Sequence, residues 1–185
     1  MPKRNILLIL TDQQRYDTLG VNGSAVCKTP HTDKLAEEGV NFTNAYSACG
    51  LCSPARASIY TGLLPHRHGI TRNVMSGDPL NTSISEEFPT LAERLNQEGY
   101  RSHFLGKWHA GDRLPTQAGF TGMDVEGYGV AAEHGDYQAY LREKGLEEPE
   151  TVPLGAGWAH RLTLAGKKTG PVEASIPYYL AERAI

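Results

Sequence analysis

The chain has 185 residues, a formal net charge of −3 at pH 7 and a hydrophobic content of 39%. This length is enough for one domain with a buried core, and the mildly acidic balance excludes the charge pattern of proteins that bind nucleic acids or anionic membranes. Three cysteines argue against a disulfide scaffold and favour a reducing compartment.

The first hydrophobic segment is a short aliphatic run near the N-terminus. The run Ile6 to Leu10 is too short for a signal peptide or a transmembrane helix, so we expect a cytoplasmic protein without a membrane partner. From Asn5 to Leu10 the run is continuous and bounded by polar residues. This pattern predicts a buried strand in a parallel sheet.

Polar residues follow that predicted strand directly. Ligands of α/β folds bind at the carboxyl ends of parallel strands, which is where Asp12 and Gln13 would lie. A carboxylate and an amide oxygen suit a hard divalent cation. The alternative is an ordinary aspartate-containing turn. Further on, the pattern predicts a helix over 33–38, stopped by Gly39, and a second strand over 41–47.

A cysteine motif comes next and reads CGLCSPARASIYTG over residues 49–62. Pro54 suits the first turn of a helix, where its missing N–H has no partner to lose, and Gly62 is a typical helix end. Cys52 is therefore expected at a helix N-terminus, where backbone N–H groups and the helix dipole favour an anion. Arg56 lies about one helical turn further on.

The spacing of Cys49 and Cys52 also fits a redox pair or half of a zinc site. Zinc needs a second pair of ligands at a similar spacing, and the remaining cysteine is Cys27. A thioredoxin-like pair gives no role to Arg56. A thiol enzyme that uses Cys52 directly is a third alternative.

After the motif, residues 65–69 read as a polar turn. Its histidines, His66 and His68, are expected to be solvated and have no assigned role. Asn73 follows in a loop. A helix over 89–98 is then predicted from Leu91 and Leu95 on one face, and a strand over 100–105 comes after it.

Lys107 and His109 follow the strand over 100–105. Because side chains alternate along an extended chain, we expect both on the same side, with Trp108 packed on the other. Residues 119–170 then hold ten of the twenty glycines, which predicts variable loops with one helix near 136–144. The predicted division is a core over 1–118, loops over 119–174 and the start of a helix over 175–185.

Three blocks together resemble the type I sulfatases. They are NILLILTDQQRYDTLG at 5–20, the Cys-x-Pro-x-Arg core with its Thr-Gly tail, and GKWHAG at 106–111. The resemblance covers nearly the whole chain, as an N-terminal portion of the family's catalytic region. It implies an alkaline-phosphatase-like α/β fold, with a central, mostly parallel sheet and helices on both faces. The fold is expected to be incomplete, because the family's distal metal and substrate ligands have no match after Gly111.

The resemblance also implies a chemistry. In this family a maturation enzyme oxidises the cysteine to formylglycine, whose hydrate attacks sulfur and then collapses to the aldehyde as sulfate leaves. The cation is expected to be Ca²⁺, with Mg²⁺ and Mn²⁺ as alternatives. The residues that match are Asp12, Gln13 and Cys52 for the metal, Cys52, Arg56, Lys107 and His109 for catalysis, and Asn73, Lys107 and His109 for the substrate.

The expected function is hydrolysis of a small-molecule or saccharide sulfate ester. The pair Asp12-Gln13, where many members have two aspartates, also resembles the choline-sulfatase and phosphonate monoester hydrolase branches. A phosphonate monoester hydrolase or phosphodiesterase is therefore an alternative, and a non-catalytic fragment is another. An incomplete sheet exposes an edge and an apolar face, which favours association between copies.

Overall fold

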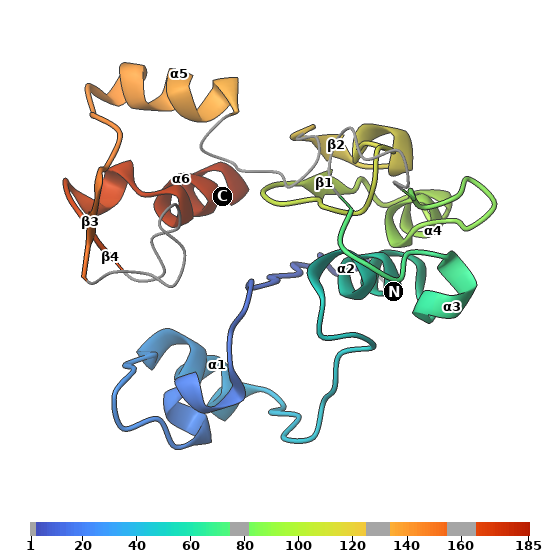
Figure 1. The fold of residues 1–185 in the computed structure, drawn as a ribbon, viewed down its shortest axis with the longest axis horizontal. Coiled ribbons are helices and arrows are strands. Elements are labelled where there is room, and N and C mark those ends of the chain that lie inside the picture. The colour runs from blue at the N-terminus through green and yellow to red at the C-terminus, as the bar shows by residue number, and fades with distance from the viewer. Residues whose placement is uncertain (1–2, 75–81, 125–133, 155–165) are drawn as a thin grey trace. The chain divides into compact units, whose positions relative to one another are not determined.

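The computed structural model describes residues 3–74, 82–124, 134–154 and 166–185 (Figure 1). The chain divides into two compact units, Met1–Ser47 and Ala48–Ile185, which we describe separately. The helices and strands are α1 (Pro30–Glu38), α2 (Cys52–Thr61), α3 (Pro65–His68), α4 (Leu91–Gln97), β1 (His103–Phe104), β2 (Thr121–Gly122), α5 (Gly135–Lys144), β3 (Thr151–Pro153), β4 (Gly166–Lys168) and α6 (Ile176–Ala184).

The first unit is organised by polar contacts around α1. The Thr29 hydroxyl accepts a hydrogen bond from the Gly20 N–H at 2.8 Å, and the Asp33 carboxylate accepts one from the Val21 N–H at 2.8 Å. The helix begins at Pro30, three residues earlier than predicted, and ends before Gly39 as expected. No described residue of this unit is fully buried, so these bonds rather than an apolar core hold its turns in place.

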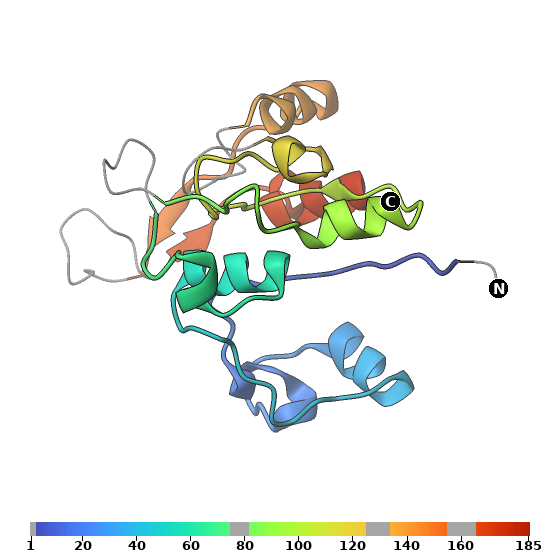
Figure 2. The same ribbon diagram turned by 90° about the vertical axis from the view of Figure 1, so that its right-hand side faces the viewer.

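The two strands predicted in the first unit are absent from its described residues. Side chains from Ile6 to Leu10 are 41–75% exposed, and this stretch is an extended trace without a strand arrow (Figure 2). Residues 41–47 likewise form no strand, and Phe42 is 75% exposed. The predictions of a buried strand over 5–10 and a second strand over 41–47 are therefore wrong for this chain. An aliphatic run becomes a strand only when neighbouring strands satisfy its backbone groups.

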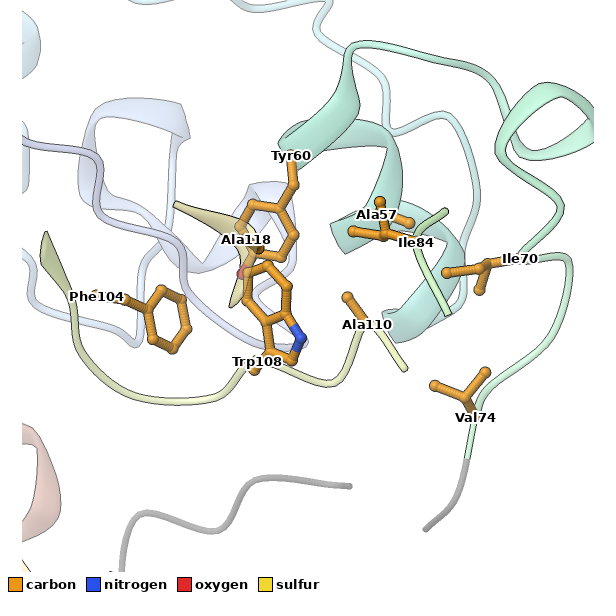
Figure 3. Packing of buried hydrophobic residues seen from close by; sticks show 9 residues of the cluster. All are labelled: Ala57, Tyr60, Ile70, Val74, Ile84, Phe104, Trp108, Ala110 and Ala118. Carbon is orange, nitrogen blue, oxygen red and sulfur yellow. The ribbon is translucent and has the colours of Figure 1, made fainter. Parts of the chain in front are cut away.

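The second unit has an aromatic core between α2 and the segment after β1. The rings of Tyr60 and Trp108 stack with centroids 4.3 Å apart and planes inclined by 15° (Figure 3). Phe104 and Phe120 meet the Trp108 ring edge-on, at 5.4 and 6.0 Å. Stacked and edge-to-face pairs add to the free energy gained by burying their area. The other buried residues of this core are Ala57, Ile70, Val74, Ile84, Ala110 and Ala118.

The sheet content is small. β1 pairs in parallel with β2, with His103 opposite Thr121 and Phe104 opposite Gly122, and β3 pairs antiparallel with β4. A β-carbon at Gly122 would lie 2.4 Å from the Phe104 carbonyl oxygen, so this close pairing requires glycine. The predicted strand over 100–105 is thus two residues long. Of the expected parallel sheet, the described residues contain the β1–β2 pair.

The helix α4 begins with a capping box. The Thr90 hydroxyl accepts a hydrogen bond from the Glu93 N–H, and the Glu93 carboxylate accepts one from the Thr90 N–H. The helix buries Ala92, whereas Leu91 is exposed. The predicted helix is confirmed with shorter bounds, and of its predicted apolar face Leu91 is exposed while Leu95 is half-buried.

A second aromatic cluster joins α5 and α6. Tyr137 and Tyr140 both pack on Tyr179, and the Tyr137 hydroxyl donates to the Ala174 carbonyl at 2.7 Å. The predicted helix near 136–144 is confirmed as α5, and the helix expected over 175–185 is α6, capped by the Ser175 hydroxyl. None of the helices in the described ranges is long and apolar enough to span a bilayer.

Candidate active site

Cys52 is the first residue of α2, as the sequence predicts, and its side chain is half-buried. All three cysteines are thiols rather than disulfides. The residue before the helix, Leu51, has no side chain that can cap it. The helix ends at Gly62, which has a left-handed φ of 71°. The cysteine therefore lies at the positive end of a ten-residue helix dipole.

Asn73 supplies the missing cap from a distant loop. Its side-chain oxygen accepts a hydrogen bond from the Ser53 N–H at 3.1 Å. A second hydrogen bond runs in the opposite direction: the Val74 N–H donates to the Ser53 hydroxyl oxygen at 3.1 Å. The side chain of Ser53 is completely buried. This reciprocal pair fixes residues 73–74 against the first turn of α2, which brings Asn73 next to Cys52 in the structure.

Arg56 lies one turn along α2 and is buried, with 6% of its surface exposed. Its Nη1 donates to the backbone carbonyl of Lys107 at 2.5 Å. The resemblance assigns Arg56 to catalysis, and the structure shows that its side chain contacts the Lys107 segment. Burial raises the pKa of the neighbouring Tyr60 above its usual value, and the charge of Arg56 only partly opposes this shift.

Lys107 and His109 do not lie on a strand. β1 ends at Phe104, and the backbone turns at Gly106 and at His109, where φ is 99° and 50°. His109 is completely buried and Lys107 is half-buried. The extended backbone on which the predicted alternation rests is therefore absent at these residues. The His109 Nε2 lies 2.8 Å from the Val74 carbonyl oxygen.

Gln13 and His109 share an uncommon backbone conformation. Their φ angles are 56° and 50°, and no other non-glycine residue in the described ranges has a positive φ. A left-handed conformation costs an ordinary residue about 1–2 kcal/mol and persists where the surrounding structure holds it. Such residues gather at functional sites, and both positions were selected from the sequence as site residues.

Asp12 and Gln13 lie in the first unit and are exposed. Their oxygen atoms fit a hard cation, but a Ca²⁺ ion takes six to eight oxygen ligands. The described residues contain no group of three or more His, Cys, Asp or Glu that could hold a metal ion. These two residues therefore fit part of a coordination sphere, and further ligands are needed to complete it.

His68 is buried, whereas the sequence predicts a solvated side chain. Residues 65–68 form the short helix α3 rather than a turn, and His68 is 3% exposed, whereas His66 is solvated. The Nδ1 atom of His68 accepts the Ile70 N–H at 3.1 Å, so Nε2 carries the proton and donates to the Ser58 hydroxyl at 3.0 Å. Burial lowers the pKa of His68. It is a structural histidine.

Two hollows among the described residues of the second unit, of about 160 and 460 Å³, are lined by none of the predicted catalytic residues. The smaller one lies at the far end of α2 from Cys52. Their linings are Thr61, Leu63, Arg67, Glu87, Phe88, Pro89 and Arg94 for the first, and Ser83, Ile84, Ser85, Glu86, Asp112, Arg113 and Gln117 for the second.

The fold and the site together define an α/β protein of the alkaline-phosphatase-like class. The solved phosphonate monoester hydrolase of Agrobacterium radiobacter superimposes with a TM-score of 0.68 at 26% identity, over 94% of this chain and 35% of that one. The sulfatase family model matches residues 4–154. The chain belongs to the sulfatase family.

Two similar proteins are also sulfatases by name. Arylsulfatase G of Mus musculus is 39% identical over 127 residues, which are 66% of this chain and 23% of that protein. N-acetylgalactosamine-6-sulfatase of Homo sapiens is 42% identical over 115 residues, which are 59% of this chain and 22% of that protein. The chain thus spans less than a quarter of the length of these relatives. The predicted family and fold class are confirmed.

Proposed function

We propose that this chain is part of an enzyme that hydrolyses sulfate monoesters by cleaving the S–O bond, with the residue at position 52 as nucleophile. One observation carries the proposal. The Cys-x-Pro-x-Arg segment forms the first turns of α2, and hydrogen bonds tie the Asn73 and Lys107 segments to these turns. Membership of the sulfatase family supports the same reaction.

The N-terminus of α2 supplies the electrostatic setting for an anionic substrate, because the helix dipole is positive at Cys52. Once oxidised to formylglycine and hydrated, this residue supplies a hydroxyl nucleophile and a second hydroxyl whose deprotonation releases sulfate without attack by water. Arg56 holds the backbone of Lys107, and thereby fixes where the Lys107 side chain leaves the main chain.

The charged and polar side chains then have separate roles. The ammonium group of Lys107 attracts sulfate oxygens as a point charge. Asn73 uses its oxygen to accept from Ser53, which turns its NH₂ group towards donation to the ester oxygens of the substrate. His109 donates through Nε2 to the Val74 carbonyl, so its Nδ1 would accept from the nucleophile's hydroxyl, or donate to a sulfate oxygen when the ring is protonated. Each of these contacts strengthens as negative charge develops in the transition state.

A divalent cation would be held by Asp12 and Gln13, and the resemblance to the sulfatases adds the residue at position 52 to its ligands. Bound there, it would act as a Lewis acid that stabilises negative charge on oxygen. Ca²⁺ is the first candidate, and Mg²⁺ and Mn²⁺ have the same preference for oxygen ligands. A maturation enzyme that generates formylglycine is the partner that this mechanism requires.

The substrate class we propose is a sulfated saccharide or a small sulfate ester. The name of the relative N-acetylgalactosamine-6-sulfatase refers to a sugar sulfate. A second candidate is a phosphonate monoester, because the phosphonate monoester hydrolase superimposes on 94% of this chain. Sulfate and phosphonate esters present similar anionic oxygens to the same site. Rates on a sulfate and a phosphonate ester of one leaving group would distinguish these candidates.

Mass spectrometry of the protein from its own host tests the nucleophile. We expect the tryptic peptide that ends at Arg56 to carry an aldehyde at position 52, while Cys49 in the same peptide stays a thiol. Cys49→Ser should leave the conversion and the turnover unchanged, and Cys52→Ala should abolish both. An unmodified Cys52 in a host that matures other sulfatases would contradict the mechanism. A modified protein with no turnover on either ester would instead favour the non-catalytic fragment.

A further inference from the structure

A chain of hydrogen bonds connects the nucleophile helix to His109 through residues that the sulfatase motif does not explain. Val74 is the centre of this chain, because its N–H donates to the Ser53 hydroxyl at 3.1 Å and its carbonyl oxygen lies 2.8 Å from the His109 Nε2. These three residues are at most 1% exposed. Figure 3 shows Val74 and Ala110, the sequence neighbour of His109, towards the end of α2 opposite to Tyr60.

The chemistry of these groups fixes the direction of each bond. A carbonyl oxygen only accepts, so the His109 Nε2 must carry a proton, and in the neutral ring Nδ1 is the acceptor. The backbone N–H of Val74 only donates, so the Ser53 hydroxyl accepts through its oxygen. Each bond therefore constrains the next. The hydroxyl holds the Val74 peptide, and the Val74 carbonyl selects the tautomer and orientation of the imidazole.

Burial makes the serine hydroxyl hard to replace. An alanine at position 53 would leave the Val74 N–H buried without an acceptor, and water has no access to a residue that is 1% exposed. Asn73 does not substitute for the hydroxyl, since its oxygen already accepts from the Ser53 N–H at 3.1 Å. The two bonds form a closed pair between the first turn of α2 and residues 73–74.

We infer that Ser53 is a positioning residue, which acts through Val74 to fix the His109 ring relative to the first turn of the nucleophile helix. Its importance for catalysis rests on the proposed function, whereas its structural effect does not. Any reaction at position 52 that uses His109 would depend on this serine, although its side chain is buried behind the helix terminus.

Amide hydrogen exchange on the 185-residue chain tests the inference. In Ser53→Ala we expect the Val74 amide to exchange about tenfold faster or more, because it loses its acceptor. The Ile70 amide is the internal reference, since it donates to His68 and should keep its rate. Ser53→Thr retains the hydroxyl and should restore the Val74 rate. The ¹⁵N shifts of the neutral His109 ring should indicate the Nε2–H tautomer in the wild type and a mixture in Ser53→Ala.

The matched control is Ser58→Ala. This serine lies in the same helix, and its hydroxyl bonds to His68 instead of the 73–74 segment. It should change neither the Val74 exchange rate nor the His109 tautomer. If Ser53→Ala also loses protection at Ile70, the variant has unfolded. Ser53→Cys then repeats the test, because its thiol occupies the place of the hydroxyl and is a weaker acceptor.

Unchanged Val74 exchange and an unchanged tautomer in a folded Ser53 variant would overturn the inference. The outcome is separable from that of the proposed function, since exchange needs no turnover. A protein with the expected exchange pattern and no activity on sulfate or phosphonate esters refutes the proposed function alone. An active sulfatase in which Ser53→Ala leaves Val74 protected refutes the positioning role alone.

Discussion

The indole of Trp108 stacks on the phenol ring of Tyr60, which connects the segment carrying Lys107 and His109 to the nucleophile helix. The two centroids are 4.3 Å apart. The indole N–H also donates to the Arg113 carbonyl at 2.7 Å, and the Trp108 side chain is completely buried. This one side chain therefore packs on α2 and anchors the loop after β1.

Trp108→Ala should destabilise the second unit strongly. Removing a buried tryptophan leaves a cavity and costs about 3–5 kcal/mol of the free energy of unfolding. Trp108→Phe should cost less, because it keeps most of the stacking area and loses the bond to the Arg113 carbonyl. Urea unfolding followed by circular dichroism measures both. Tyr46→Ala is the control, since Tyr46 is 89% exposed and its removal should change stability by less than about 0.5 kcal/mol.

Glu93 has two structural roles that can be separated. One carboxylate oxygen caps Thr90 at 2.7 Å, and the other pairs with Arg113, whose side chain is 9% exposed. Glu93→Ala removes both contacts and should cost about 2–4 kcal/mol of stability. Glu93→Gln can still cap the helix and should cost clearly less.

Thermal and urea unfolding of the two Glu93 variants would measure the difference. Glu98→Ala, an exposed change at the other end of α4, serves as the control and should be nearly neutral. Equal losses for the glutamine and alanine variants would mean that the charge pair with Arg113 contributes nearly everything and the cap nothing.

His68 should make the stability of the chain depend on pH. Its folded-state pKa lies below the ordinary 6.5 because it is buried, so the unfolded chain binds more protons as the pH falls from 6.5. The contribution of neutral His68 to the free energy of unfolding is thus complete above pH 6.5. As the pH falls from 6.5 to the lower folded-state pKa, this contribution decreases by at most about 1.4 kcal/mol per pH unit. His68→Asn should flatten this dependence, whereas His66→Asn should retain it. A wild-type slope that survives His68→Asn would assign the effect to another group.

Asp12 should be essential for the divalent cation. In the protein from its own host, calorimetry should detect a stoichiometric Ca²⁺ site that is lost in Asp12→Ala, because a hard cation loses its charged ligand. Asp17→Ala is a matched control, since Asp17 lies in the same segment and pairs with Arg15 instead. Equal metal binding by wild type and Asp12→Ala would exclude this aspartate as a ligand.

The sequence predicts secondary structure most reliably where residues within one segment determine its conformation. Pro54 and Gly62 mark the start and the end of α2, and the structure confirms both. The prediction fails where residues far away in the chain determine the conformation. The run from Ile6 to Leu10 has the composition of a buried strand, but it is exposed and forms no strand in the described residues. A pattern of residues cannot show whether strands are present to pair with it.

The same division holds at the site. The motifs indicate His109 as a site residue, but they carry no sign of its left-handed backbone. Ser53 and His68 were missed as structural residues, because a serine within a motif and a histidine beside an exposed one carry no local sign of burial. The hydrogen bonds to Val74 and Ile70 that define their roles come from residues that only the folded chain brings close.

The contacts that assemble the site join residues far apart along the chain, which has a consequence for the order of events during synthesis. The bonds from Ser53 to Asn73, from His109 to Val74 and from Arg56 to Lys107 span 20, 35 and 51 residues. Contacts of long sequence separation require loop closure before they form, so they follow the local winding of α2. Until residue 107 has left the ribosome, the bond between Arg56 and Lys107 cannot exist. If Cys52 is oxidised as proposed, a modifying enzyme would have to reach this segment before that bond forms.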